Sequence, residues 1–181
     1  MKKVLLSLLA ALCLSSAAFA QTFTLHSSDL GGQATMKQFF NGMNCTGENI
    51  SPNLRWENAP TGTKYYALTI FDKDAPTGSG FWHWVVFNIP ASTTELKTGA
   101  GDPAKGLMPA GAIQSVTDFG KPGYGGPCPP PGHGLHHYEV TVFALKDKIN
   151  LDEKASPAFV GFNIWANTLA KASMVFYAER K

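Results

Sequence analysis

Three long apolar runs place the strongest constraint on the fold. They are rich in β-branched and aromatic residues, and they span Tyr65–Phe71, Trp84–Ile89 and Tyr138–Leu145. Each run is apolar at successive positions instead of at every second one, so both faces of each strand must be covered by other parts of the chain. Shorter candidate strands, bounded by Gly and Pro, lie at Thr22–Leu25, Asn53–Trp56 and Met174–Ala178. The sequence therefore predicts a mainly β, layered structure with these strands inside it.

One or two short peripheral helices are predicted, notably one near residues 157–172. Ser156 and Pro157 form a favourable N-cap and first helical position. Four apolar residues then follow at helical spacing: Phe162, Trp165, Leu169 and Ala172. We expect this stripe to pack on a sheet. No internal repeat or linker divides the 181 residues, so residues 21–181 are expected to form a single domain.

The N-terminal segment has the three parts of a signal peptide in order. Lys2 and Lys3 are followed by the apolar run Val4–Leu14 and then by a small-x-small sequence ending at Ala20. This run is shorter than the ~20 apolar residues that a transmembrane helix needs. We therefore expect cleavage between Ala20 and Gln21 and a periplasmic or secreted mature protein, in preference to a buried N-terminal helix.

Charge and cysteine content limit the partners of the mature chain. Two of the 15 basic residues lie in the segment expected to be removed, which leaves 13 basic and 13 acidic residues. No cluster of Lys or Arg remains to neutralise phosphates, so nucleic acid is a poor partner. Cys45 and Cys128 are the two cysteines left. In an oxidising compartment the simplest prediction is that they form one disulfide, and the alternative is two buried free thiols.

Polar side chains gather at the ends of the strong strands. Asp72 follows one strand and His83 precedes the next, so a hairpin would return both to the same edge of the sheet. His136 and Tyr138 are two apart in an extended segment and face one side, whereas His137 faces the other. The sequence thus predicts a carboxylate, two imidazoles and a phenol at one edge.

A stiff loop, residues 122–134, runs directly into this edge, since ten of its thirteen residues are Gly or Pro. Such a group of side chains beside an apolar wall suits an anion. Protonated imidazole and phenol donate hydrogen bonds, while Asp72 can hold an imidazole in one tautomer or keep it protonated. We expect His83 and His136 to be the donors, so that binding tightens as the pH falls through the ordinary histidine pKa of about 6.5.

Three segments resemble the phosphatidylethanolamine-binding protein (PEBP) family, namely DKDAP at 72–76, WHWVVFNIP at 82–90 and GPCPPPGHGLHHYEVTVFAL at 126–145. The likeness is greatest to its bacterial Raf-kinase-inhibitor-like branch, including exported members, and extends over the mature chain. It implies an all-β fold of two antiparallel sheets and non-enzymatic binding of phosphate-like groups, phospholipid headgroups or carboxylates, without a cofactor. Carried over by position, the ligand-binding residues are Asp72, Pro76, His83, Pro129, Pro130, His136 and Tyr138.

Two positions depart from the family pattern. Lys73 replaces a proline and places a cation near the mouth of the pocket, and His137 replaces an arginine. We therefore expect a structural ion pair on the opposite strand face to be absent. A Cys45–Cys128 disulfide resembles a feature of the exported branch.

Other functions stay open at this point. A metal-dependent hydrolase could draw on an imidazole and carboxylate set consisting of His83, His133, His136, His137, Asp72 and Asp74. Against it, neither H-E-x-x-H nor G-x-S-x-G occurs, and adjacent strand residues point to opposite faces. An inhibitor of a protease or another protein would use the Pro-rich loop as its contact surface. A homodimer and an unknown protein partner are compatible with each of these functions.

Overall fold

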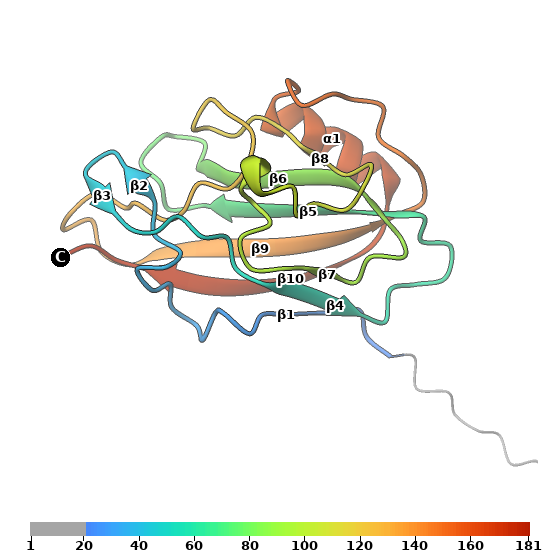
Figure 1. The fold of residues 1–181 in the computed structure, drawn as a ribbon, viewed down its shortest axis with the longest axis horizontal. Helices are drawn as coiled ribbons and strands as arrows, with labels where there is room; N and C mark the ends of the chain where they lie inside the picture. Colours follow the sequence, from blue (N-terminus) through green and yellow to red (C-terminus); the bar gives the residue numbers. More distant parts are fainter. Residues whose placement is uncertain (1–20) are drawn as a thin grey trace, which may run out of the picture.

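The fold centres on a five-stranded antiparallel sheet. The computed structural model describes residues 21–181, and the predicted signal peptide, residues 1–20, lies outside the described residues. Along the sheet the strands are ordered β10 (Thr168–Ala178), β9 (His136–Leu145), β5 (Tyr65–Asp72), β6 (Phe81–Pro90) and β8 (Ile113–Gln114) (Figure 1). The three strongly apolar runs form β5, β6 and β9, and each of these strands has a neighbour on both sides.

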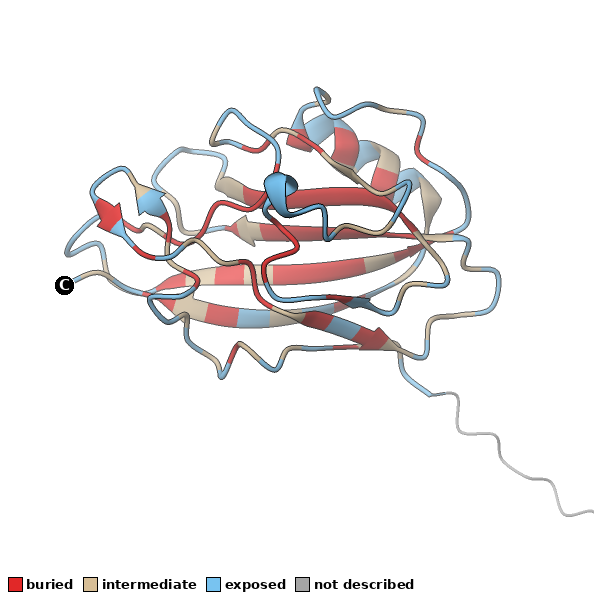
Figure 2. Ribbon diagram, in the orientation of Figure 1, coloured by how far each residue is buried: buried red, intermediate tan, exposed pale blue. Residues whose placement is uncertain are grey.

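A second sheet covers one face of the first. Its three strands are ordered β1 (Thr24–His26), β4 (Leu54–Glu57) and β7 (Glu95–Leu96). Trp56 of this sheet lies in one buried core with Leu68 and Ile70 of β5, and the buried stretches of β5, β6 and β9 form the centre of the molecule (Figure 2). The prediction of a mainly β fold with two antiparallel sheets is confirmed.

The helix α1 (Pro157–Asn167) covers part of the other face. Ala67 of β5 and Val85 of β6 lie in a second buried cluster with Val160 and Ile164 of the helix. Because Ala67 and Leu68 are successive strand residues, they point to opposite faces, and each meets a different cluster. This explains why the central strands are apolar at every position.

The predicted packing face of the helix is wrong. Its N-cap is Ser156, as expected, but Phe162 and Trp165 are 60% and 75% exposed, whereas Val160 and Ile164 are buried. The helix ends at Asn167, and the rest of the predicted stripe belongs to β10, which pairs with β9. The pairing with β9 is a long-range contact, and it overrides the local helical periodicity.

A disulfide ties a small hairpin to the Pro-rich loop. The hairpin consists of β2 (Asn41–Gly42) and β3 (Cys45–Thr46). Cys45 and Cys128 are bonded, with their Cα atoms 6.0 Å apart, so the alternative of two free thiols is excluded. A single turn of 3-10 helix, η1 (Pro103–Lys105), is the remaining helical element among the described residues.

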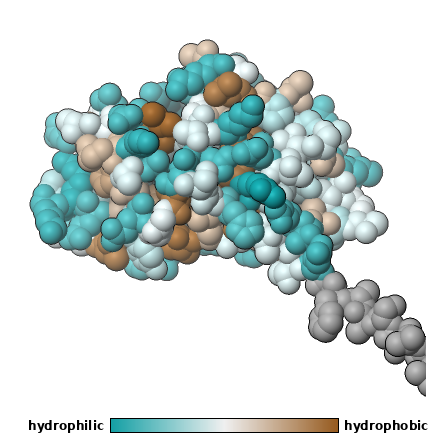
Figure 3. Space-filling view, turned by 60° about the horizontal axis from the view of Figure 1, so that its bottom comes forward, coloured by the Kyte–Doolittle hydropathy of each residue, from teal (hydrophilic) through white to brown (hydrophobic). Residues whose placement is uncertain are grey.

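The part of the surface seen in Figure 3 is neither uniformly hydrophobic nor uniformly hydrophilic. In the view of Figure 3, hydrophobic side chains lie in small separate groups among hydrophilic ones. Within residues 21–181, no helix is both long enough and apolar enough to cross a membrane.

Candidate functional site

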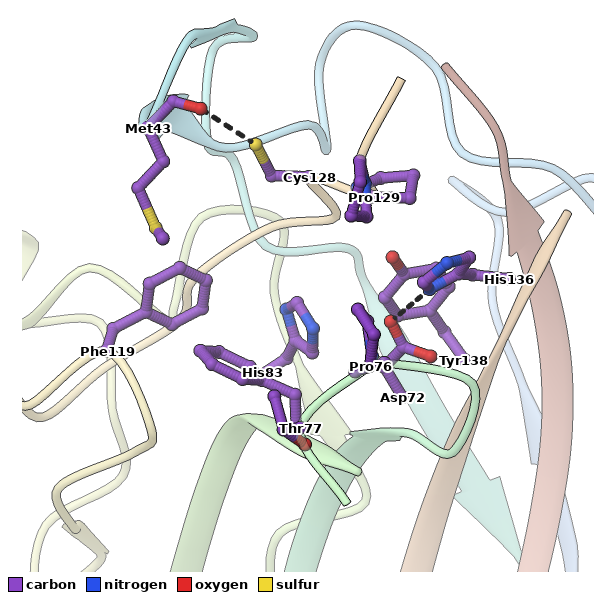
Figure 4. Close-up of a pocket in the computed structure, with 13 residues that line it drawn as sticks. Met43, Asp72, Pro76, Thr77, His83, Phe119, Cys128, Pro129, His136 and Tyr138 are labelled. Carbon is purple, nitrogen blue, oxygen red and sulfur yellow. Dashed lines mark hydrogen bonds and ion pairs between the residues drawn. The ribbon is translucent and has the colours of Figure 1, made fainter. Parts of the chain in front are cut away.

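A cavity of about 130 Å³ lies where β5 ends and β6 and β9 begin. All of the residues that the sequence analysis assigned to a pocket line it, and Figure 4 shows most of them around the same space: Asp72, Pro76, His83, Pro129, Pro130, His136 and Tyr138. The structure therefore brings the predicted residues together, although they come from three strands and two loops.

Strand register explains how the polar residues meet. Asp72 at the end of β5 lies directly opposite Tyr138 of β9. On the other side of β5, Trp82 and Trp84 of β6 pair with consecutive β5 residues, so that His83 between them has no partner of its own. This extra residue is a β-bulge, a device that re-aims a side chain. It allows His83 to face the cavity although its neighbours point to the two faces of the sheet.

A buried carboxylate–imidazole pair forms the floor of the site. Asp72 and His136 are 4% and 1% exposed, and their Oδ2 and Nδ1 atoms are 2.7 Å apart. The other carboxylate oxygen of Asp72 accepts a hydrogen bond of 2.9 Å from the backbone amide of Asp74. Because a carboxylate only accepts, His136 Nδ1 carries the proton in this contact. Nε2 is then the one nitrogen of His136 left for another partner.

His133 contacts that remaining nitrogen. Its Nδ1 atom lies 2.7 Å from His136 Nε2, and the two ring centroids are 5.0 Å apart. His133 is exposed, whereas His136 is buried. A chain of three side chains thus runs from Asp72 through His136 to the surface. From the sequence His133 is a candidate only as a metal ligand, and this contact was not predicted.

The sequence predicts His83 as a hydrogen-bond donor to the ligand, but in the structure its free nitrogen, Nε2, is an acceptor. Its Nδ1 atom lies 2.7 Å from the carbonyl oxygen of Gly125, which can only accept, so Nδ1 donates. Burial lowers the pKa of His83 from 6.5 to about 4, although that carbonyl and the Asp72 charge oppose the shift. At neutral pH the ring is therefore uncharged, and its Nε2 atom presents a lone pair.

Tyr138 supplies a buried hydroxyl. Burial, with the nearby Asp72 charge, raises the pKa of this phenol, so the group stays protonated. A hydrogen-bond-like interaction of the phenol with the Asp72 side chain adds to this shift, but Tyr138 Oη makes no hydrogen bond of normal distance and angle within residues 21–181. The ring is held edge-on to His83 at 5.0 Å and stacks on Phe176 at 5.1 Å. The ring is thus held in place, and no described residue takes up the hydrogen of its hydroxyl.

A second pair of carboxylate and imidazole lies on the other strand face. Asp74 Oδ2 accepts from the backbone amide of His137 at 2.7 Å and lies 2.6 Å from His137 Nδ1. The expectation that the ion pair on this face is absent is therefore wrong, because Asp74 reaches the imidazole. Burial alone would raise the pKa of Asp74, but the hydrogen bonds from His137 and the charges of His137 and Lys73 lower it overall.

The rest of the cavity wall is mainly apolar. Residues that sequence analysis missed include Met43, Phe81 and Phe119. Phe119 lies 4.9 Å from Phe81 and 5.4 Å from His83, measured between ring centroids. Met43 lies in the turn between β2 and β3. The Cys45–Cys128 disulfide links this hairpin to the Pro-rich loop. A pairing of the two cysteines was the one sequence signal that could have placed residue 43 near the loop.

Metal-ion geometry is not found in the described part of the chain. Within residues 21–181, no group of three or more His, Cys, Asp or Glu side chains is arranged to hold a metal ion. His137 faces Asp74 on the opposite side of β9 from His136, so the side chains of the metal hypothesis are divided between two faces.

Comparison with known sequences identifies the family. The sequence model of the phosphatidylethanolamine-binding proteins matches residues 26–179, and the chain belongs to this family. Within it, the chain is similar to two UPF0098 proteins of Escherichia coli K12. It is 45% identical to YbcL over 183 residues, which cover 100% of each chain. It is 50% identical to YbhB over 155 residues, which cover 83% of this chain and 96% of YbhB.

Solved structures agree with this assignment. The crystal structure of E. coli YbcL, described as a member of the mammalian PEBP family, superimposes with a TM-score of 0.86 at 46% identity, over 88% of this chain and 99% of that one. A putative PEBP homologue from Chlamydia trachomatis has a TM-score of 0.73 at 24% identity, over 88% and 98% of the two chains, and shares the fold.

Proposed function

We propose that the cavity binds a small acid, a phosphoryl or carboxyl group that carries a proton, and that the protein is a non-enzymatic binding protein. One observation carries this proposal: the buried hydroxyl of Tyr138 has no hydrogen-bond partner among residues 21–181, and its ring lies edge-on to His83 in the same cavity, with the ring centroids 5.0 Å apart. A buried polar group without a partner costs about 1–3 kcal/mol. A ligand that accepts from Tyr138 and donates to His83 would offset this cost.

The protonation states favour a ligand that brings a proton. A fully ionised acid offers only acceptors, and it would meet the lone pair of neutral His83 and the carboxylate of Asp72. A phosphate monoester loses its second proton near pH 6, so a fraction still carries it at neutral pH. Its P–O–H group can donate to His83 Nε2 while another oxygen accepts from Tyr138. We therefore expect binding to be coupled to net proton uptake.

The dimensions of the cavity favour a headgroup over a whole lipid. Its volume of about 130 Å³ lies well below the ~300–1,000 Å³ of sites that hold drug-sized ligands. Met43, Phe119 and Pro129 give it an apolar rim, which would contact the carbon atoms next to the acidic group. Phosphate, phosphoethanolamine and acetate are the probes that follow from this size and chemistry.

Two features support binding without catalysis. Of the side chains that line the cavity, Cys128 is bonded to Cys45, and Thr77 donates its hydroxyl hydrogen to the carbonyl of Gly80. Neither is set up as a nucleophile beside a base.

The disulfide supports export. A structural disulfide persists in oxidising compartments, which agrees with removal of residues 1–20 as a signal peptide and a periplasmic, single-domain mature protein. Inhibition of a partner protein through the Pro-rich loop stays a prediction.

Replacement of Tyr138 by Phe tests the proposal. The change removes only the oxygen atom, so the ring keeps its stacking on Phe176. We expect the affinity for phosphate or phosphoethanolamine, measured by calorimetry, to fall roughly 10- to 150-fold, because a hydrogen bond to an acidic ligand is lost. Stability in urea should stay equal or rise, since an unpaired buried hydroxyl is removed.

Tyr124→Phe is the matched control. Tyr124 is also buried, but its hydroxyl donates to the backbone carbonyl of Gln38 at 3.0 Å and does not line the cavity. This variant should lose about 1 kcal/mol of stability and keep its affinity. Calorimetry of the wild type in two buffers of different ionisation enthalpy measures the proton uptake. Equal affinities of Tyr138→Phe and the wild type for all three probes would refute the proposed site.

A further inference from the structure

We infer that His133 is a gating residue of this cavity, which competes with the ligand for the one available nitrogen of His136. The inference rests on the proposed function of the cavity and adds a residue that does not line it. His136 has two ring nitrogens, and Asp72 occupies Nδ1 at 2.7 Å. His133 occupies Nε2, also at 2.7 Å. A ligand can use His136 only after His133 has left.

The position of His133 allows it to leave. It is exposed and lies between Gly132 and Gly134, whose φ angles are +71° and +88°. A Cβ atom at either glycine would meet nothing within 4 Å, so this part of the loop is loosely packed. Arg180 holds the loop on both sides of Pro131: its guanidinium donates to the Pro129 carbonyl at 3.4 Å, and its own carbonyl accepts from Gly132 N at 3.0 Å. The side chain of His133 can therefore swing while its loop stays attached.

The contact between the two imidazoles admits only one proton. A hydrogen bond of 2.7 Å between two ring nitrogens needs a hydrogen on one and a lone pair on the other. When both rings are protonated, both nitrogens carry hydrogens and both rings are cationic, so the contact must break. His136 then presents an N–H donor to the cavity, with the Asp72 carboxylate behind it as counter-charge. A second proton thus opens the gate and supplies a donor for an acidic ligand.

Among residues 21–181, few charged groups contact the pair, and the neighbouring Asp74–His137 pair lies on the opposite face of β9. Asp72 of β5 contacts His136 directly, and Tyr138 of the same strand as His136 lies 6.4 Å from it between ring centroids. His83 lines the opposite side of the cavity and is uncharged at neutral pH. The Arg180 guanidinium, held at the Pro129 carbonyl, is the cation nearest to the loop among the contacts described. Neither the tyrosine nor the arginine changes charge between pH 5 and 8, so the two imidazoles dominate the response.

The test uses the mature protein, inorganic phosphate and two substitutions of one residue. His133→Ala removes the competitor. His133→Asn places an amide near the position of Nδ1, so it can still bind His136 but does not titrate. His26→Ala, an exposed histidine on β1 of the other sheet, is the control. Affinity for phosphate is measured by calorimetry between pH 5 and pH 8.

At pH 8 we expect His133→Ala to bind phosphate about 2- to 10-fold more tightly than the wild type, since one net hydrogen bond no longer has to be broken. The advantage should shrink as the pH falls, because a second proton on the pair opens the wild-type gate. His133→Asn should bind like the wild type at pH 8 and more weakly than it at pH 5. A loss of affinity in His133→Ala would instead make His133 a ligand contact and overturn the inference.

A ligand-free measurement separates this inference from the proposed function. Nitrogen-15 shifts of the imidazole rings report which ring nitrogens carry protons. We expect the His136 Nε2 resonance to change in His133→Ala at pH 8 and the titrations of the two rings to depend on each other in the wild type. Independent titrations and an unchanged His136 resonance would refute the gate. Failure of phosphate to bind, with coupled titrations present, would refute the proposed ligand and keep the contact.

Discussion

The disulfide between Cys45 and Cys128 is expected to contribute a large part of the stability of this domain. The bonded residues are 83 apart in the sequence. For a loop of that size, the chain-entropy relation gives about 15 cal/mol/K, or about 4.5 kcal/mol at 25 °C, for the constraint on the unfolded chain. An unfolding entropy of about 2.1 cal/mol/K per residue amounts to about 340 cal/mol/K for residues 21–181, so loss of the bond should lower Tm by about 13 °C.

The double variant Cys45→Ala/Cys128→Ala isolates this effect, because a single substitution would leave a free thiol beside a cavity. Urea unfolding and calorimetry of the mature protein, with and without reductant, provide the comparison. Reductant should shift the wild type towards the double variant and leave the double variant unchanged. Wild type and variant should have similar affinities for phosphate if the loop keeps its place through the Arg180 contacts to the Pro129 carbonyl and Gly132 amide.

A loss below about 1 kcal/mol would refute this reasoning. It would mean that the unfolded chain already keeps the two segments close, so that the bond constrains little. Hydrogen bonds between the same segments exist in the folded protein: Phe40 N donates to the Pro127 carbonyl at 3.0 Å, and Gly126 N donates to Asn49 Oδ1 at 2.8 Å. A small effect would therefore point to these contacts as the structure that persists in the unfolded state.

Four further substitutions test other parts of the structure. Ile164→Ala should cost about 2–5 kcal/mol in urea unfolding and Trp165→Ala less than about 0.5 kcal/mol, which is the reverse of the order expected from the helical stripe. His137→Ala should cost at most about 1 kcal/mol at pH 7, because the pair with Asp74 is partly exposed. Since the pKa of Asp74 is lowered on folding, that contribution should be present above pH 4 and disappear as the pH falls below it. Gly126→Ala should prevent accumulation of folded protein, since its Cβ would lie 1.8 Å from a backbone carbonyl oxygen.

Strands that are apolar on both faces could be predicted from the sequence, because a run such as Tyr138–Leu145 has few alternatives to burial between two layers. The observed strand β9 begins only two residues earlier, at His136. The helix was harder to predict. Its start has a local signal in Ser156, but its end at Asn167 depends on pairing of the next segment with β9. Local periodicity carries no information on such a distant partner.

Many of the residues that line the cavity could likewise be predicted from the sequence, but their arrangement in space could not. A hairpin brings Asp72 and His83 to one edge in any register that pairs the two strands. The bulge that turns His83 towards the cavity depends on register alone, and no local residue pattern marks it. Phe119 and Met43 belong to no motif that contains the other site residues. They line the cavity because of tertiary packing and, for Met43, because of the nearby disulfide.

The chemical role of the histidines depends on their partners more than on the histidines themselves. From the sequence, His83 and His136 were expected to donate to an anion with ordinary pKa values. In the structure, the Gly125 carbonyl and the Asp72 carboxylate take the Nδ1 hydrogen of each ring, and burial keeps His83 uncharged at neutral pH. Nε2 of His83 is then an acceptor, Nε2 of His136 is engaged by His133, and Tyr138 supplies a hydroxyl donor. One backbone oxygen and one side-chain oxygen thus take the Nδ1 hydrogens that the sequence-based expectation had assigned to an anion, and this is the reason for proposing a ligand that carries its own proton.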